Sequence, residues 1–335
     1  MPVGDNGSEE SGSGGVAGDV RRMHPLSRMR EPGHRYMRIC APMVRYSKLP
    51  FRELVRGYGV DLAYTPMILA DVFKHSDISR ATEFRTNAGD SPVVVQFAAS
   101  NATDLGDAAE LVARHSNGVD LNCGCPQKWA VAEHIGSYLM EQPELVRDMV
   151  RHVKARTSAV KMHDGASFPC SIKIRVHDDL AKTVEFVRRA EAVGVDWITV
   201  HGRTRTQKNT ESINVEAIRI AKSSVGVPVF ANGSVFTVED ADRIVSETGT
   251  DGVMVARGLL ENPAMFAGYA TTPLACVQRY ARLAVAYGTT HFIMHHHLMF
   301  MMEAGMSKAE KRLFNCLPSI PAVLEYLEDH YGITI

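Results

Sequence analysis

Short apolar runs alternate with longer amphipathic stretches along most of this chain, and the alternation limits the folds that it can adopt. Strand-length runs lie at 37–41, 61–65, 92–97, 118–122, 170–176, 196–201, 227–231 and 252–255. Helical patterns lie between them, near 50–58, 103–115, 143–156, 180–193, 214–224 and 237–247, whereas residues 66–90 show no regular pattern. Eight strands alternating with helices over about 220 residues predict an α/β fold, a (β/α)8 TIM barrel. A doubly wound sheet competes with it, but no G-x-G-x-x-G motif follows the first strand.

The segments outside this pattern predict two further regions. Residues 1–36 begin rich in Gly, Ser, Asp and Glu, and they predict a disordered tail before a barrel of residues 37–270. The basic stretch 21–38 is a solvated surface or, alternatively, an RNA-contacting arm or a targeting segment. Residues 271–335 predict a small C-terminal helical domain with helices at 273–287, 289–304, 307–314 and 319–330. Its run of three histidines predicts no metal site, because consecutive residues point in different directions around a helix.

Charge and cysteine content restrict the classes of protein that fit. The chain has 37 Lys and Arg against 38 Asp and Glu, so a local basic patch would have to hold any nucleic acid. Its six cysteines are dispersed without a CxxC pair, which predicts a reducing compartment and no zinc site. No apolar run reaches membrane-spanning length. We therefore expect a cytoplasmic monomer without metal or membrane partners, leaving open a nuclear or organellar pool.

Residues suited to ligand binding follow most of the predicted strands. In a (β/α)8 barrel the carboxyl ends of the strands meet at one mouth, where the chemistry takes place. The residues that fall there are Pro42, Met43, Gln96, Asn122, Cys125, His201, Arg203, Asn232, Gly233 and Arg257. We therefore expect them to form a ring around that mouth.

The fifth predicted strand places cations on one face. Because side chains alternate along a strand, Lys173 and Arg175 share the face opposite Ile172 and Ile174. Two buried cations need an anionic or strongly polar partner. An edge strand with a solvated face is the alternative, but in this context we expect Lys173 to meet an electron-rich ligand group inside the mouth.

The loops after the seventh and eighth strands predict a phosphate site. They read ANGSV (231–235) and ARGLL (256–260), and such loops commonly bind phosphate in this fold. Gly233 and Gly258 permit close approach of the backbone, and Arg257 adds charge. FMN fits both the phosphate site and Lys173. A sugar phosphate bound with a Schiff base at Lys173 fits them as well.

The stretch VDLNCGCPQKW (119–129) delivers a constrained thiol to the same mouth. An apolar strand ends at Asn122, and Cys125 stands between Gly124 and Pro126, which fix part of its backbone. A thiol in this place donates a proton, attacks an electrophile or binds a metal. A buried structural cysteine is the alternative.

Taken together, these motifs resemble the tRNA-dihydrouridine synthase family over roughly residue 39 to the C-terminus. The resemblance rests on APM (41–43), VVVQF (93–97), DLNCGCPQ (120–127), SIKIR (171–175), VHGRT (200–204), ANG (231–233) and ARGLLENPAMF (256–266). The C-terminal part is most similar to the eukaryotic branch that acts at positions 20a and 20b of the tRNA D-loop.

The resemblance implies an FMN-dependent enzyme that uses NADPH or NADH to reduce uridine in tRNA to 5,6-dihydrouridine. It implies that FMN delivers a hydride to C6 of the flipped-out uracil, and that Cys125 protonates C5, so the thiol must be protonated beforehand. The implied cofactor contacts are Pro42, Met43, Val44, Gln96, Lys173, His201, Asn232, Gly233, Ser234, Ala256 and Arg257.

The residues of the same mouth also predict contacts with RNA. We expect Asn122, Arg175 and Arg203 to bind the substrate, with Arg175 meeting the flipped uridine. Lys128, Arg205 and Lys208 are further candidates for phosphate contacts, or else ordinary surface charges. The family resemblance also implies that the helical domain contacts tRNA.

Two other functions remain open from the sequence. One is an FMN barrel oxidoreductase that acts on a free pyrimidine, similar to dihydroorotate dehydrogenase; the helical tail disfavours it. The other is a non-catalytic tRNA-binding protein, against which the intact Cys125 and Lys173 argue.

Overall fold

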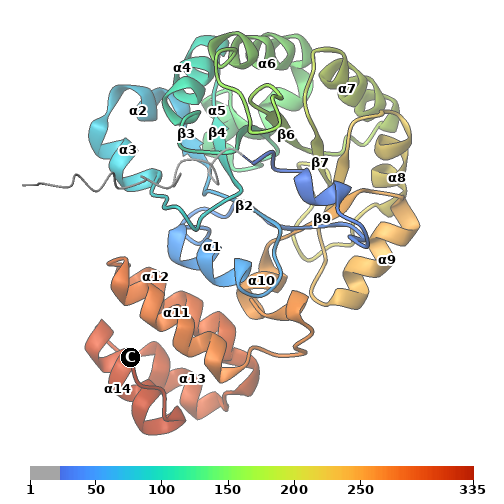
Figure 1. The fold of residues 1–335 in the computed structure, drawn as a ribbon. Coiled ribbons are helices and arrows are strands. Elements are labelled where there is room, and N and C mark those ends of the chain that lie inside the picture. The colour runs from blue at the N-terminus through green and yellow to red at the C-terminus, as the bar shows by residue number, and fades with distance from the viewer. Residues whose placement is uncertain (1–22) are drawn as a thin grey trace, which may run out of the picture.

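In the computed structural model, which describes residues 23–335, eight parallel strands close into a barrel (Figure 1). The strands are β1 (Met37–Cys40), β2 (Leu62–Tyr64), β4 (Val93–Ala98), β5 (Gly118–Cys123), β6 (Cys170–Arg175), β7 (Ile198–His201), β8 (Val229–Asn232) and β9 (Gly252–Val255). Pairing of β1 with β9 and of β2 with β4 completes the ring. The predicted (β/α)8 fold is therefore confirmed.

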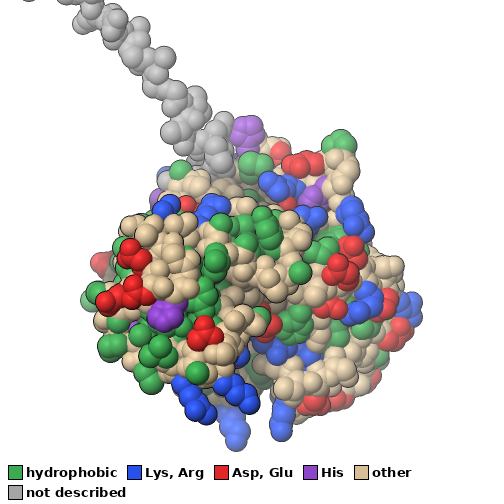
Figure 2. Space-filling view, turned by 90° about the horizontal axis from the view of Figure 1, so that it is seen from below, with side chains coloured by type: hydrophobic (Ala, Val, Ile, Leu, Met, Phe, Trp, Pro, Cys, Tyr) green, Lys and Arg blue, Asp and Glu red, His purple; other side chains and the backbone are tan. Residues whose placement is uncertain are grey.

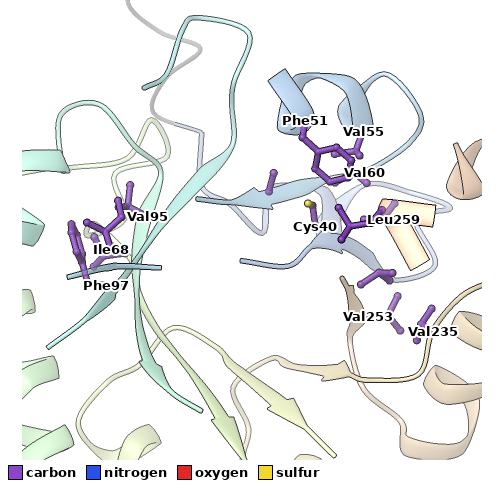
Figure 3. Packing of buried hydrophobic residues seen from close by; sticks show 14 of the residues in the cluster. Cys40, Phe51, Val55, Val60, Ile68, Val95, Phe97, Val235, Val253 and Leu259 are labelled. Atoms are coloured by element: carbon purple, nitrogen blue, oxygen red, sulfur yellow. The ribbon is translucent and has the colours of Figure 1, made fainter. Parts of the chain in front are cut away.

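Helices cover the outside of this barrel (Figure 1). Those predicted between the strands are α1 (Leu49–Arg56), α4 (Ala102–Val112), α6 (Pro143–Arg156), α7 (Leu180–Ala192), α8 (Val215–Ser223) and α9 (Val238–Thr248). Shorter helices α5 (Lys128–Ala132) and α10 (Arg257–Glu261) follow β5 and β9. Aliphatic residues from strands and helices fill the layer between them; Figure 3 shows Cys40 of β1 beside Phe51 and Val55 of α1.

Residues 66–90 contain more regular structure than expected. The short strand β3 (Ile68–Leu69) pairs with β4 outside the ring, and α2 (Ala70–His75) and α3 (Asp77–Glu83) follow it. The Ser76 hydroxyl accepts a hydrogen bond from the Ser79 N–H and caps α3. Helices of six and seven residues are too short to give a clear periodicity in the sequence.

The N-terminal segment closes the end of the barrel opposite the mouth. Residues 1–22 of the predicted tail lie outside the described residues. Residues 23–36, expected to be disordered, pack instead against the barrel. Leu26 and Met29 join the apolar cluster of the barrel interior, and Arg28 forms a 2.8 Å ion pair with Asp61. The basic residues of this segment had indicated a solvated tail. Burial of the two apolar side chains and the ion pair hold the segment against the barrel instead.

The C-terminal helices pack beside α1 and α10 (Figure 1). They are α11 (Leu274–Ala286), α12 (His291–Met302), α13 (Lys308–Asn315) and α14 (Ile320–Tyr331), close to the predicted ranges. The three histidines of α12 face separate partners. His295 contacts the Phe314 carbonyl oxygen at 2.8 Å, His296 the Tyr46 hydroxyl at 3.1 Å, and His297 the Tyr46 carbonyl oxygen at 3.1 Å.

Contacts from α12 hold the loop between β1 and α1, which includes Tyr46. The ring of Tyr46 lies edge-on to His297 and Phe300, with centroids 5.3 and 5.6 Å apart. His297 is fully buried, and burial lowers its pKa to about 3, so the imidazole is neutral and its Nε2–H donates to the Tyr46 carbonyl. The helical domain therefore fixes a loop that carries three of the expected cofactor residues, Pro42, Met43 and Val44.

Replacing His297 should loosen this loop. In His297→Leu the Tyr46 carbonyl loses its donor, so amide hydrogen exchange of residues 43–47 should accelerate about five- to tenfold, which corresponds to a bond of ~1 kcal/mol. His297→Gln retains an amide donor and should stay near wild type. Equal exchange in both variants would show that ring packing alone holds the loop.

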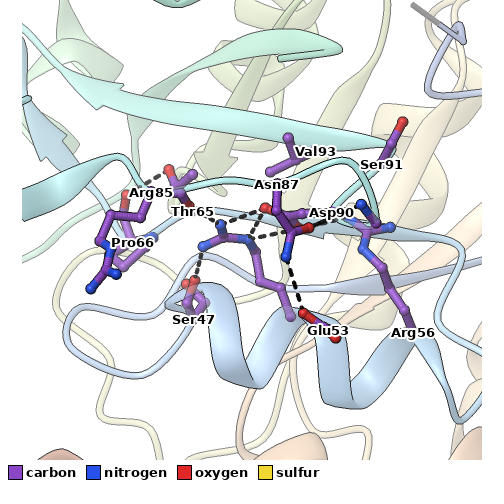
Figure 4. Close-up of polar contacts among 12 residues, drawn as sticks. Ser47, Glu53, Arg56, Thr65, Pro66, Arg85, Asn87, Asp90, Ser91 and Val93 are labelled. Atoms are coloured by element: carbon purple, nitrogen blue, oxygen red, sulfur yellow. Dashed lines mark hydrogen bonds and ion pairs between the residues drawn. The ribbon is translucent and has the colours of Figure 1, made fainter. Parts of the chain in front are cut away.

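A buried ion pair ties α1 to the segment before β4 (Figure 4). Arg52 donates to both carboxylate oxygens of Asp90 and also to the carbonyl oxygens of Ser47 and Arg85. Arg56 adds a second ion pair to Asp90 at 3.3 Å. Because the Asp90 carboxylate is wholly buried, each charge of the ion pair is tolerated in the interior only while the other is present.

Asp90→Ala should therefore destabilise the protein by about 3–5 kcal/mol, because it leaves two buried guanidinium groups without their carboxylate. Urea unfolding measures the effect. Asp77→Ala serves as the matched control: Asp77 pairs with Arg80 but is 93% exposed, and its loss should cost less than about 1 kcal/mol. A small loss in Asp90→Ala would mean that solvent enters the site.

Candidate active site

The predicted site residues gather at the carboxyl ends of the strands, in three groups. Pro42, Met43 and Val44 occupy the loop after β1, where Val44 is 55% exposed. A second group lies on the inner faces of the strands and in the loop after β5: Gln96, Asn122, Cys125, Lys173 and Arg175. A third group lines one pocket: His201, Arg203, Asn232, Gly233, Ser234, Ala256 and Arg257.

A chain of hydrogen bonds runs through the second group from Asp120, a residue that sequence reasoning missed. The Asp120 carboxylate accepts from Ser171 Oγ at 2.6 Å and from Gln96 Nε2 at 2.8 Å. Gln96 Oε1 then accepts from Asn122 Nδ2 at 2.9 Å. Burial raises the pKa of Asp120 to about 6, and these two hydrogen bonds together with Lys173 oppose the rise. The sequence signal that could have identified Asp120 is a charged residue inside an apolar run.

The chain ends at the cysteine loop. Asn122 Oδ1 accepts from the backbone N–H groups of Gly124 and Cys125 at 3.0 and 2.9 Å. Gly136 backs the loop, since a Cβ there would lie 2.7 Å from the Cys125 carbonyl oxygen, and its φ is +64°. The Ser137 N–H donates to the same carbonyl oxygen at 2.9 Å. Cys125 is thus held from both sides and remains partly exposed, whereas Cys123 is buried.

Lys173 faces the barrel interior, as the strand alternation predicted. No hydrogen bond or ion pair joins its ammonium group to another residue within 23–335. Burial and, to a smaller extent, the neighbouring Arg175 lower the Lys173 pKa to about 8, while Asp120 and Cys125 act in the opposite direction. A cation without a partner at this depth indicates a place for an electron-rich group.

Two of the expected substrate contacts, Arg175 and Arg203, are largely committed to the protein itself. Arg175 Nε donates to the Gly124 carbonyl oxygen and Nη1 to that of Thr204, both at 2.8 Å, which supports the cysteine loop. Arg203 is only 2% exposed and lines the pocket at the mouth, so its expected contact with the substrate stays a prediction. It turns inward because its guanidinium binds Ser234 Oγ at 2.8 Å and the Glu211 carbonyl oxygen at 2.7 Å.

Arg203 also defines the state of His201 in the pocket. Its Nη1 donates to His201 Nε2 at 3.1 Å, so that ring nitrogen is the acceptor. Burial lowers the His201 pKa to about 2, with additional effects of Lys173 and the arginines, so the imidazole is neutral. Gly233 has a φ of +121°, and a Cβ there would lie 2.7 Å from Ile213. Only glycine is therefore tolerated at this position. The lack of a side chain leaves the backbone open to close approach by a phosphate.

These features test whether FMN fits the site. The pocket brings Arg203, Arg257 and the backbone of Gly233 to one place, which meets the need of a phosphate. Lys173 offers an unpaired cation to the electron-rich edge of an isoalloxazine ring. Gln96 and Asn232 add amide groups to the same mouth. The residues present therefore fit the group.

The fold and this mouth, with its thiol, unpaired ammonium and phosphate pocket, define a (β/α)8 barrel enzyme. The chain belongs to the dihydrouridine synthase family, because the model described as Dihydrouridine synthase (Dus) matches residues 39–328. The family resemblance seen in the sequence is thereby confirmed.

Curated relatives agree with this assignment, and a solved structure shares the fold. A Mus musculus tRNA-dihydrouridine(20a/20b) synthase-like protein is 53% identical over 88% of this chain and 89% of its own. The Schizosaccharomyces pombe tRNA-dihydrouridine(20a/20b) synthase is 44% identical over 90% of each chain. Both names specify NAD(P)+. A solved Pseudomonas geniculata amine oxidase is 12% identical with a TM-score of 0.50, over 69% of this chain and 46% of its own, and shows the fold alone.

Replacing the unpaired cation should stabilise the cofactor-free protein. Since the Lys173 pKa is near 8 in the fold and 10.5 in its ordinary state, the unfolded chain binds more protons between these pH values, and stability rises with pH there. Lys173→Met should therefore raise the unfolding free energy at pH 7 by about 1–3 kcal/mol, and by much less above pH 10. Urea unfolding at both pH values measures this. Destabilisation at pH 7 would show that Lys173 has a favourable partner.

Proposed function

We propose that this protein reduces uridines at positions 20a and 20b of tRNA to 5,6-dihydrouridine, with FMN bound at the barrel mouth and NAD(P)H as reductant. The observation that carries the proposal is that one mouth holds both a fixed, partly exposed thiol at Cys125 and the ammonium group of Lys173, which has no partner in the described part of the chain. Relatives at 53% and 44% identity carry the target positions and NAD(P)+ in their names.

Cys125 supplies the proton in this mechanism. When bound and reduced by NAD(P)H, FMN supplies the hydride that C6 of uracil accepts. Negative charge then builds at C5 and O4, and the Cys125 thiol transfers its proton to C5, which completes the saturated C5–C6 bond. Asn122 keeps the thiol in place through the Cys125 backbone. The resulting thiolate lies near Arg175 until solvent returns a proton.

The groups that surround the thiol position the ligands. We propose that Lys173 keeps its charge under the electron-rich ring edge, while Arg203, Ser234, Gly233 and Arg257 hold the phosphate. The target uridine must leave the base stack to reach this depth. Asn122 and the free edge of the Arg175 guanidinium then face its polar atoms.

The tRNA would lie across the mouth and the helical domain. Lys128 at the start of α5 is exposed, as are Arg205 and Lys208 in the loop after β7, and a phosphate-binding surface requires such exposure. Figure 2 shows Lys and Arg side chains gathered at the lower edge of the molecule, next to a hollow in its surface. No helix within residues 23–335 is both long and apolar enough to cross a membrane.

Mapping dihydrouridine in unmodified tRNA after incubation with FMN and NADPH tests the proposal. Cys125→Ala should lower the rate by about 10²–10⁴-fold while leaving flavin binding intact, because only the proton donor is lost. Cys316→Ala removes an exposed thiol in the helical domain and should have no effect. Oxidation of NADPH without any dihydrouridine in tRNA would contradict the substrate assignment and favour a free pyrimidine.

A further inference from the structure

A second pocket lies at the rim of the mouth, beside the cysteine loop. Its walls come from segments that follow the carboxyl ends of β2, β4 and β5, so it opens on the side of the barrel where the target uridine would enter. The residues that form it are Leu69, Asp71, Ala98, Ser100, Trp129 and Ile135, together with Glu133 and Ala99.

The floor of this rim pocket is continuous with the packing of Cys125. Ala98 and Ile135 belong to a small apolar cluster against which both Leu69 and Cys125 pack. A ligand in the rim pocket would therefore be separated from the cysteine loop by one layer of side chains. A nucleotide next to the reacting uridine in the same RNA strand would be separated from the cysteine loop in this way.

The polar side chains of the rim pocket have no hydrogen-bond or ion-pair partners among residues 23–335. Trp129, on α5, is 48% exposed, which is unusual for so large an aromatic side chain. The carboxylates of Asp71 and Glu133 form no hydrogen bond or ion pair with any residue of the described part of the chain. Carboxylates repel phosphate, but they accept hydrogen bonds from the amino and imino groups on a base edge.

We propose that the rim pocket binds a nucleobase of the tRNA next to the target uridine. The base stacks on the Trp129 indole, and an N–H group on its edge donates to Asp71 or Glu133. This inference rests on the proposed function, because the bound RNA places the base there.

Tryptophan fluorescence tests the stacking directly. The sequence has two tryptophans, and the other, Trp197, is fully buried and donates to Tyr64 at 2.8 Å. Unmodified tRNA added to the FMN-loaded protein should therefore quench the emission of Trp129 and shield it from acrylamide. The remaining emission of Trp129→Phe should not respond. Quenching by NADP+ at the same site would instead assign the pocket to the reductant's adenine and overturn the proposal.

Binding measurements test the contribution of each group. Trp129→Ala should raise the Kd for tRNA about tenfold, whereas Trp129→Phe should stay within about threefold, because stacking needs an aromatic face. Leu111→Ala, which truncates a 45% exposed side chain on α4, is the matched control and should have no effect. Glu133→Gln and Asp71→Asn should weaken binding singly or together. If both substitutions tighten it, the carboxylates only repel RNA and the base-edge contact is wrong.

The two proposals fail in different ways. Dihydrouridine formed at normal rates in Trp129→Ala, with tRNA bound as tightly as in wild type, would overturn the rim pocket and leave the proposed function intact. A wild-type protein that neither binds tRNA nor forms dihydrouridine would overturn the function itself.

Discussion

The arrangement of the mouth depends on the buried carboxylate of Asp120. An isolated side-chain amide can turn over without changing its shape, but Gln96 donates to Asp120 and must therefore present its oxygen to Asn122. Asn122 in turn must present its own oxygen to the N–H groups of Gly124 and Cys125. One carboxylate at the centre of the barrel thus sets the direction of every bond that leads to the thiol. Such a network specifies one conformation because each of its members is satisfied.

The same mouth concentrates positive charge that the protein does not neutralise by itself. Lys173 and Arg175 come from β6, Arg203 follows β7 and Arg257 follows β9. Burial keeps His201 neutral and lowers the Lys173 pKa, and neighbouring cations add to both effects. A phosphate and an electron-rich ring would relieve the repulsion between these cations. The free energy released in this way would add to the affinity for an anionic ligand.

The sequence predicted what depends on local periodicity and left undetermined what depends on distant contacts. Strand alternation placed Lys173 inside the barrel, and the abrupt end of β5 placed Cys125 at the mouth. The inward turn of Arg203 could not be predicted, because its partner Ser234 comes from the loop after β8 and Glu211 folds back from further along the same loop. Packing of Leu26 into the barrel interior likewise depends on residues far along the chain. Asp120 looked like one polar residue among others until its partners on β4 and β6 were brought together.

The helical domain contributes to the site through packing as well as through its surface. The histidines of α12 invite a metal site, yet their rings diverge, and His296 and His297 both end on Tyr46. Tyr46 belongs to the loop that begins with the expected cofactor residues, and Arg45 beside it has a φ of +72°. A strained backbone persists only where its surroundings hold it. The neutral, buried imidazole of His297 is one such support, so the domain expected to meet tRNA also holds in shape the loop that carries the expected cofactor residues.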